Sequence, residues 1–325
     1  LAMRAVAPAL AVGNAVVLKP DPRTAVCGGY VIARLFELAG LPSGLLAVVP
    51  GDHEVGEALC EDPNVAMIQF TGSTNAGRAV GQLASKNLKK VSLELGGKNS
   101  LIVLEDADID LAVKNAAWGA WLHQGQICMT AGRIFVHASI IDKFAALLAE
   151  KASQLPAGDP MTGAVALGPL ISLRQCEHAK KILDDSEAAG AELLIGGEVN
   201  GLVMQPAVLK GVGEQMAAYR EEIFGPVAVL IPFENDDDAV RMANDTEYGL
   251  AAAVISNNVA RAMSMGESLH AGLIHINDQT VNDDVVHPFG GVGASGNATS
   301  IGGPAHWEAF THWQWITVKS APPAH

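Results

Sequence analysis

The order of apolar and polar positions along the chain predicts that strands and helices alternate. Short runs rich in β-branched residues, at 14–20, 45–50, 65–70 and 89–95, are typical of buried strands. Residues 24–39 and 75–87 lie between them and are predicted to be helices, with Gly40 just past the end of the first. This order favours parallel strand pairing through right-handed crossovers, which places ligand sites at the carboxyl ends of the strands.

The rest of the chain continues the alternation with longer helices. Strands are predicted at 133–138, 191–197, 204–209, 227–233 and 249–256, and helices at 108–121, 140–154, 175–189 and 236–246. Residues 273–297 are polar and glycine-rich and fit no regular spacing, so we expect a long functional loop there. The Gly96–Gly97 pair marks the expected boundary between two domains.

Composition narrows the class of protein. The 325 residues exceed what one compact core usually holds, and 49% hydrophobic with 17% charged residues is ordinary globular composition. A net charge of −14, from 21 basic and 35 acidic residues, argues against partners such as nucleic acid or anionic membranes. No apolar run is long enough for a membrane span, and we expect no signal peptide at the start of this sequence. The chain starts with Leu1 in mid-pattern, so we expect it to lack its natural N-terminus.

The four cysteines are too far apart in sequence to form a C-x-x-C pair. They are therefore interpreted as free thiols in a reducing cytosol, which predicts a cytoplasmic protein. No metal site is predicted.

The segment 70–77, FTGSTNAG, follows a predicted strand and opens a predicted helix. A helix N-terminus offers free N–H groups and partial positive charge, which suits a pyrophosphate. Gly72 would let the backbone approach the phosphates, Ser73 could donate a hydrogen bond, and Gly77 would allow tight helix packing. A plain strand-to-helix turn made of small residues explains the same segment.

Two further segments carry candidate reactive groups. In LELGGKN, Glu94 follows an apolar strand; a desolvated glutamate has a raised pKa and can act as a base, although an exposed strand end is the simpler alternative. In HQGQICMTAGR, Cys128 follows a turn rich in glycine and glutamine. A nucleophilic cysteine needs access and a lowered pKa, whereas an isolated cysteine is often only a small buried apolar residue. The segments EEIFGPV (221–227) and PFGGVGASG (288–296) read as turns.

Taken together, GNAVVLKP, FTGST, LELGGKN, GQICMTAGR, EEIFGPV and PFGGVGASG occur in one chain in this order. This set resembles the aldehyde dehydrogenase superfamily over essentially the whole chain. HINDQTVNDD, FGGVGASGN and FTHWQWITV are similar to its benzaldehyde/vanillin dehydrogenase branch. The resemblance implies an α/β fold with a Rossmann-type cofactor domain and an α/β catalytic domain, both with open, mostly parallel sheets. It implies an incomplete cofactor domain at 1–96, a catalytic domain at 97–306, a tail with an oligomerisation strand at 307–325, and a homodimer or homotetramer.

The resemblance also implies roles for individual residues. Cys128 would be the nucleophile and Glu94 the general base in the oxidation of an aldehyde, expected to be aromatic, to the acid through a thioester. The expected NAD-binding residues are Lys19, Gly72, Ser73, Gly77, Glu222 and Phe224. The expected walls of the aldehyde pocket are Trp121, Ile127, Met129 and Val281.

Three departures from the family pattern qualify these roles. The family's oxyanion-hole asparagine would fall upstream of Leu1, so we expect residues 1–325 alone to show little or no activity. Pro22, with Arg23 beside it, stands where the family often has an acid that grips the adenosine ribose, so NADP is possible as well as NAD. His312 replaces a glutamate near the C-terminus.

Three other classes of protein remain open as alternatives. One is a catalytically silent relative, against which the presence of both Cys128 and Glu94 argues. Another is a CoA-acylating dehydrogenase, a branch that usually lacks the general base. A plain cysteine hydrolase would leave the nucleotide-binding features without a purpose.

Overall fold

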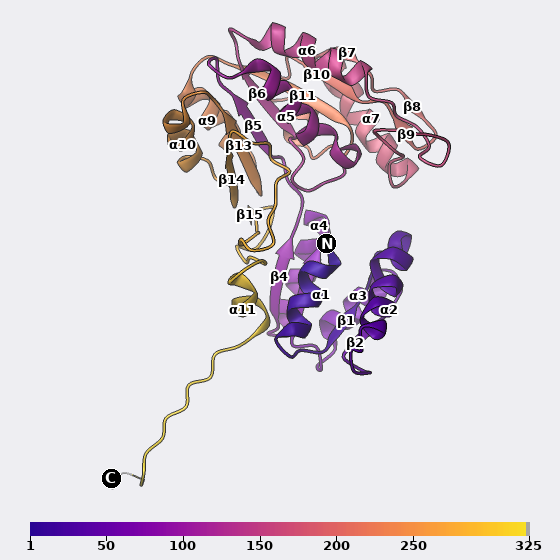
Figure 1. Ribbon diagram of the computed structural model, residues 1–325, viewed down its shortest axis with the longest axis vertical. Helices are drawn as coiled ribbons and strands as arrows, with labels where there is room; N and C mark the ends of the chain where they lie inside the picture. Colours follow the sequence, from indigo (N-terminus) through magenta and orange to yellow (C-terminus); the bar gives the residue numbers. More distant parts are fainter. Residues whose placement is uncertain (323–325) are drawn as a thin grey trace.

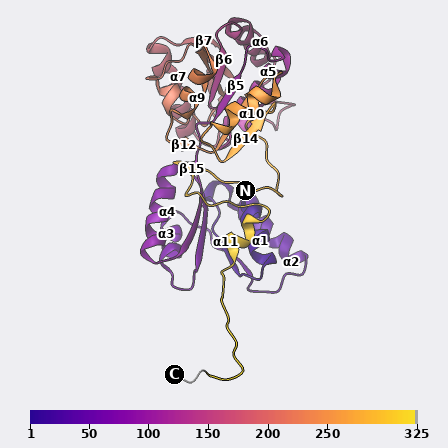
Figure 2. The same ribbon diagram turned by 90° about the vertical axis from the view of Figure 1, so that its left-hand side faces the viewer.

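The computed structural model describes residues 1–322, which form two lobes (Figure 1). One lobe holds the elements from α1 (Ala2–Ala11) to β4 (Lys90–Glu94), together with α11 (Ala305–Phe310). The other begins at β5 (Ser100–Val103) and runs to β14 (Leu273–Ile276). Residues 277–304, called the return loop below, then pass back to the first lobe, so the chain crosses between the lobes twice (Figure 2).

The larger lobe is built on a seven-stranded sheet with the order β14-β13-β5-β6-β11-β10-β7. Its other strands are β6 (Arg133–His137), β7 (Glu192–Ile195), β10 (Ala207–Lys210), β11 (Val227–Phe233) and β13 (Ala251–Ile255). Neighbouring strands from β14 to β10 are parallel, and only β7 runs antiparallel, along β10. The predicted α/β class with a mostly parallel sheet is therefore confirmed.

Helices cover both faces of this sheet, which explains why its strands are almost continuously apolar. The helices α5 (Ile109–Trp121) and α6 (Ile141–Ser153) lie on one face, and α7 (Leu173–Ala188), α9 (Asp236–Asn244) and α10 (Val259–Glu267) on the other. Successive side chains of a strand point to opposite faces. In β5, Leu101 and Val103 therefore belong to the cluster on the α5 side, whereas Ile102 belongs to the cluster on the opposite face.

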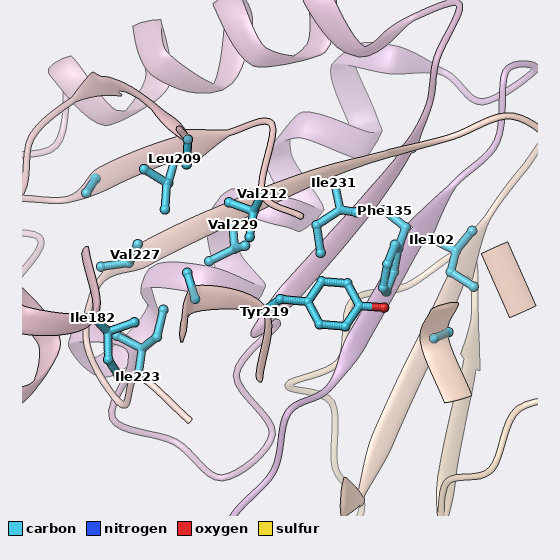
Figure 3. Close-up of a cluster of buried hydrophobic side chains, with 14 of the residues drawn as sticks. Ile102, Phe135, Ile182, Leu209, Val212, Tyr219, Ile223, Val227, Val229 and Ile231 are labelled. Atoms are coloured by element: carbon cyan, nitrogen blue, oxygen red, sulfur yellow. The ribbon is translucent and has the colours of Figure 1, made fainter. Parts of the chain in front are cut away.

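Figure 3 shows part of the cluster on the α7 side. Tyr219, from the short helix α8 (Ala217–Arg220), lies edge-on to Phe135, and its hydroxyl donates to the Met242 carbonyl at 3.0 Å. The buried phenol therefore has a hydrogen-bond partner, as a polar group in an apolar core requires.

The smaller lobe contains two parallel strand pairs. In one, β1 (Val16–Leu18) pairs with β2 (Leu46–Val48); in the other, β3 (Met67–Thr71) pairs with β4. Helices α2 (Val31–Leu38), α3 (His53–Glu61) and α4 (Thr74–Lys86) accompany them. All four strands predicted in this part are confirmed, and so are the helices predicted at 24–39 and 75–87. The first of these helices opens with a 3₁₀ turn, Pro22–Thr24, and a π-helical segment, Val26–Tyr30.

One prediction about the long glycine-rich stretch was wrong. Residues 273–276 form β14, the edge strand paired with β13, rather than the beginning of an irregular loop. The four-residue run LIHI was grouped with the polar residues that follow it, so its strand character was missed. In the structure it pairs with β13. The remainder is loop apart from β15 (Val292–Gly293), which pairs with β12 (Tyr248–Gly249).

Residues 311–322 form an extended tail and pair with no other strand in the part of the chain that the structure describes. Residues 323–325, the end of the predicted oligomerisation segment, lie outside the described residues. A strand in this tail therefore stays a prediction. Within residues 1–322, no helix has both the length and the apolar character needed to cross a bilayer.

Candidate active site

Glu94 lies at the point where β4 ends and the chain leaves the smaller lobe. Its backbone is fixed from two sides: its carbonyl accepts from the Gly72 amide at 3.0 Å, and it forms a bridge with Gly296 of the return loop. Its side chain is only 4% exposed, and neither carboxylate oxygen has a hydrogen-bond partner within the described residues. Burial raises the pKa of Glu94 to about 8, so the group can exchange protons near neutral pH.

Cys128 lies in the loop between the 3₁₀ turn η3 (Leu122–Gly125) and β6, and it is half-buried. Burial, and then the nearby carboxylates of Glu94 and Glu222, raise the pKa of its thiol to about 11, whereas the backbone N–H groups of Met129 and of Cys128 itself lower it. Burial and the two carboxylates thus hold the thiol in its neutral form, and a reactive thiolate would need a base to take its proton. The same fact shows that three groups widely separated in sequence converge here.

The turn before Cys128 holds an unusual backbone conformation. His123, Gln124 and Gly125 all have positive φ angles, of 51°, 59° and 67°. Left-handed conformations are unfavourable for non-glycine residues and persist where the surrounding structure imposes them, often at functional sites. Gly125 has no room for a side chain, since an added Cβ would lie 2.1 Å from the Gly225 carbonyl oxygen. The turn is thus packed tightly against the chain near Phe224.

Asn99, which the sequence analysis did not single out, positions the Cys128 loop. Its amide nitrogen donates to the carbonyls of Cys128 at 2.8 Å and Thr130 at 2.7 Å, and its amide oxygen accepts from the Ala251 backbone at 2.9 Å. The side chain is buried, so each of its polar atoms needs such a partner. A sequence signal did exist, because an asparagine directly before the apolar run SLIV is a polar residue entering a buried strand.

Glu222 reaches the same region from the segment before β11. Its carboxylate accepts from the Gly97 amide at 3.0 Å, and a Cβ added to Gly96 would lie 2.4 Å from a carboxylate oxygen. Burial raises the pKa of Glu222, while the Gly97 N–H and the ammonium of Lys98 act in the opposite direction. The glycine pair after Glu94 therefore leaves space for a second carboxylate. Phe224 follows in a left-handed conformation, with its carbonyl accepting from Gln175 at 3.0 Å.

Lys98 is a second residue that the sequence analysis did not single out. Its side chain is fully buried and its ammonium has no hydrogen-bond partner within the described residues. Burial and the neighbouring Arg133 lower the pKa of Lys98 to about 7. It shares the lining of a cavity with Glu222 and Phe224.

The predicted nucleotide-binding turn is adjacent to these groups. Ser73 caps the N-terminus of α4, with its hydroxyl accepting from the Ala76 amide at 3.4 Å. A Cβ on Gly72 would lie 2.5 Å from the Phe70 ring, and one on Gly77 2.3 Å from Leu95. A side chain at either position would therefore clash with its neighbours. Glycines here leave the backbone N–H groups of the turn accessible, as binding of a dinucleotide requires.

Lys19 lies apart from this turn, at the end of β1 in the other strand pair. Its ammonium donates to the Pro20 carbonyl at 3.3 Å.

Three of the four predicted pocket residues gather beside the thiol. Ile127, Met129 and Val281 form one apolar cluster with Cys128, which also contains Leu250, Ala251, Leu273 and Phe289. Trp121 lies elsewhere: it is 2% exposed and packs in the core between α5 and the sheet. Its nearness to Cys128 in sequence does not bring it to the same surface.

Comparison with known proteins finds similarity to aldehyde dehydrogenases along nearly the whole chain. The family model for the aldehyde dehydrogenase family matches residues 1–316. A vanillin dehydrogenase from Amycolatopsis sp. is 52% identical over 320 residues, which cover 98% of this chain and 66% of the relative. The benzaldehyde dehydrogenase [NAD(+)] of Pseudomonas putida is 47% identical, with 99% of this chain and 66% of the relative covered. The chain thus spans 66% of the length of these curated relatives.

A solved structure of an aldehyde dehydrogenase has the same fold as this chain. The salicylaldehyde dehydrogenase of Pseudomonas putida G7, crystallised with salicylaldehyde, superimposes with a TM-score of 0.96 at 37% identity. The match covers 100% of this chain and 68% of that structure. From its sequence and its fold, the chain belongs to the aldehyde dehydrogenase family.

Proposed function

We propose that the protein oxidises an aldehyde to the carboxylic acid, with Cys128 as the nucleophile, Glu94 as the general base and NAD as the hydride acceptor. One observation carries the proposal: the buried Glu94 carboxyl group, which has no hydrogen-bond partner within residues 1–322, lies near enough to the half-buried Cys128 thiol of the other lobe to raise the pKa of that thiol. Residues 1–96 would form the cofactor domain, 97–306 the catalytic domain, and 307–325 a tail with an oligomerisation strand.

The first half of the proposed reaction forms a thioester. Since the two carboxylates disfavour a free thiolate, the Cys128 proton passes to Glu94 as sulfur attacks the carbonyl carbon. The oxygen of the resulting hemithioacetal is then anionic, and the backbone N–H groups of Cys128 and Met129 are the nearby donors. The C=O bond would re-form as hydride leaves the carbon, and NAD held by Gly72, Ser73 and Glu222 would supply the hydride acceptor.

The second half releases the acid. Glu94 first loses to solvent the proton that it took from the thiol, and it then accepts a proton from water as the water oxygen attacks the thioester carbon. The C–S bond breaks, and the Cys128 sulfur recovers a proton. A pKa of about 8 allows Glu94 to take and give protons in both halves near neutral pH.

The residues around the site fit a dinucleotide. Gly72 and Ser73 would hold the pyrophosphate at the N-terminus of α4, and Gly77 permits the close packing of that helix on Leu95. Glu222 would accept hydroxyl protons of the nicotinamide ribose, with Phe224 packing beside it. Lys19 would bind the adenosine ribose. The name of one relative, benzaldehyde dehydrogenase [NAD(+)], supports NAD; NADP is proposed as a tolerated alternative.

An aromatic aldehyde is the proposed substrate class. Ile127, Met129, Val281 and Phe289 place apolar surface beside the thiol, which suits a flat ring. The vanillin, benzaldehyde and salicylaldehyde dehydrogenases among the relatives support the same class. The proposed assembly is a homodimer or homotetramer in the cytoplasm, where the free thiols of the chain would remain reduced.

The test is a screen of aromatic and aliphatic aldehydes with both cofactors, in which acid and acyl-CoA products are measured separately. It uses the protein extended at its N-terminus to the length of its relatives, because residues 1–325 alone are expected to show little or no activity. We expect acid as the product, a higher kcat/KM for benzaldehyde-type rings, and complete loss of turnover in Cys128→Ala with cofactor binding retained. Cys60→Ala and Cys176→Ala, which alter buried thiols in the two lobes, are the matched controls. Turnover in Cys128→Ala would disprove the nucleophile, and acyl-CoA as the product would disprove hydrolysis.

A further inference from the structure

The start of helix α4 is hydrogen-bonded to the return loop through one buried side chain. Thr74, the first residue of the helix, follows Gly72 and Ser73, and these three residues are called the phosphate turn below. The Thr74 side chain is buried, and its hydroxyl donates to the Ala294 carbonyl of the return loop at 2.8 Å. The proposed pyrophosphate site therefore has a direct contact with the segment that runs between the lobes.

The residues that receive this hydrogen bond are themselves attached to the larger lobe. The Ala294 amide donates to the Glu247 carbonyl at 2.8 Å, and the Gly249 amide donates to the side-chain oxygen of Ser295 at 3.0 Å. Ser295 is fully buried, and Gly249 belongs to β12, which pairs with β15 of the return loop. The return loop thus bonds to the phosphate turn on one side and to the larger lobe on the other.

The same short segment holds the strand that carries the proposed base. The Leu95 amide donates to the Ser295 carbonyl at 2.9 Å, and Glu94 forms its bridge with Gly296. Residues 294–296 therefore contact the phosphate turn, the end of β4 and the larger lobe at once.

This arrangement matters because the groups that must meet in the proposed reaction lie in different lobes. The phosphate turn is in the smaller lobe, and the Cys128 thiol is in the larger one. A cofactor held by its phosphates brings its nicotinamide to the thiol only if the lobes keep a fixed register, and an error of about 1 Å can cost about a hundredfold in rate. Arg78, one turn after Thr74, forms an ion pair with Glu247 at 3.1 Å, but both side chains are more than half exposed, so this pair contributes little.

We propose that Thr74 is a positioning residue that fixes the bound cofactor relative to Cys128. Its hydroxyl does not have to touch the phosphates, because it holds the turn that binds them against the segment that is bonded to the larger lobe. The inference rests on the proposed function, since it requires a dinucleotide at this turn with its nicotinamide beside the thiol.

The test compares Thr74→Val, which removes the hydroxyl and keeps the shape of the side chain, with Thr74→Ser, which keeps the hydroxyl. It uses the protein extended at its N-terminus to the length of its relatives. Fluorescence titration gives the Kd for NADH. Mass spectrometry gives the rate at which iodoacetamide alkylates Cys128 with and without saturating NAD, and a single turnover gives the rate of hydride transfer.

Bound NAD should protect the wild-type thiol from alkylation, because a nicotinamide that accepts hydride must lie beside it. Thr74→Val should lose most of this protection and transfer hydride about tenfold to a hundredfold more slowly. Its Kd for NADH should rise by no more than about threefold, because the N–H groups of the phosphate turn remain in place. Thr74→Ser should resemble the wild type in all three measurements, and Ser295→Ala, which breaks the bond to Gly249, should lose protection as Thr74→Val does.

Thr299→Val is the matched control. The Thr299 hydroxyl donates to the Ser92 side chain at 2.9 Å and so joins the same loop to β4 away from the phosphate turn. This variant should keep the protection by NAD. Full protection in Thr74→Val, or an equal loss of protection in Thr299→Val, would overturn the role of Thr74 alone. A wild-type protein that binds no NADH, or that binds it without protecting Cys128, would overturn the proposed function and this inference with it.

Discussion

At the scale of single residues, Glu94 is kept in an environment that opposes its charge. Both carboxylate oxygens are buried without hydrogen-bond partners in the described part of the chain, a condition that normally costs stability. A structural carboxylate in such a place would be paired. The lost folding stability is therefore explained by a functional need for a carboxyl group that can take and release a proton.

We predict that Glu94→Gln is more stable than the wild type at high pH. The pKa of Glu94 is about 8 in the folded protein against 4.5 for the unperturbed group, so ionisation of the wild type opposes folding increasingly between these values. The gain from the neutral amide should be near zero below pH 4.5 and complete above about 8, on the order of a few kcal/mol. Urea unfolding at both ends of this range measures it. An equal gain at both would show that packing, rather than charge, is responsible.

At the scale of elements, the turn that links β4 to β5 is crowded by groups from other segments. Gly96 faces Glu222, and Gly97 faces the carbonyl of Cys128. A close backbone approach of this kind explains why glycines stand here, although neither φ angle is positive.

Gly97→Ala should keep the fold and lose most of the activity. Its Cβ would lie 2.5 Å from the Cys128 backbone oxygen and 2.8 Å from the Asn99 amide oxygen, so the nucleophile loop must move. A displacement of this kind costs roughly a hundredfold in turnover. Gly163→Ala is the control, because nothing lies within 4 Å of its added Cβ. Wild-type kcat in Gly97→Ala would show that the loop position does not matter.

The segment after β1 carries a prediction about the choice of cofactor. Arg23 donates from Nε to Asp21 at 2.9 Å and from Nη2 at 2.8 Å, so its guanidinium is already engaged by a carboxylate. Asp21→Asn should free it to meet a 2′-phosphate and raise kcat/KM for NADP relative to NAD by up to about fivefold, the value of an exposed ion pair. Arg23→Ala should lower the same ratio. Ratios that stay unchanged in both variants would exclude Arg23 from cofactor recognition.

Local sequence patterns predicted the helices and strands better than they predicted contacts between residues far apart in the chain. The strands β1 to β4 and the helix α4 follow from apolar runs and from short-range chemistry, whereas the capping of α4 by Ser73 was not predicted. Arg4 and Asp283 could not be paired from sequence, since 279 positions separate them and only the fold brings the loop of Asp283 to helix α1. Trp121 was assigned to the pocket because it precedes Cys128 closely, but the helix geometry of α5 turns it into the core.

At the scale of the whole molecule, the return loop makes the two lobes interdependent. Asn297 acts like a short extra strand beside β4: its side-chain oxygen accepts from the Leu93 amide, and its side-chain nitrogen donates to the Val91 carbonyl at 2.9 Å. The smaller lobe is thereby completed by residues that follow the larger one in sequence.

Asn297→Ala should therefore weaken the connection between the lobes. The loss of two hydrogen bonds, one to a partly buried amide, is expected to cost about 1–3 kcal/mol. Hydrogen exchange at Leu93 should accelerate, while exchange in β6 and β11 should stay slow. Uniform acceleration in both lobes would mean that the lobes unfold as one unit, with Asn297 contributing only to the total.

The extended tail gives the molecule a built-in optical probe. Of its five tryptophans, Trp313 and Trp315 are more than 90% exposed and Trp118 and Trp307 more than half exposed, whereas Trp121 alone is buried. Most of the intrinsic fluorescence should therefore come from indoles in water and emit at long wavelength. If the tail pairs as a strand with a second copy of the chain, dilution to concentrations below the dissociation constant should shift that emission. Assembly could then be followed without any label.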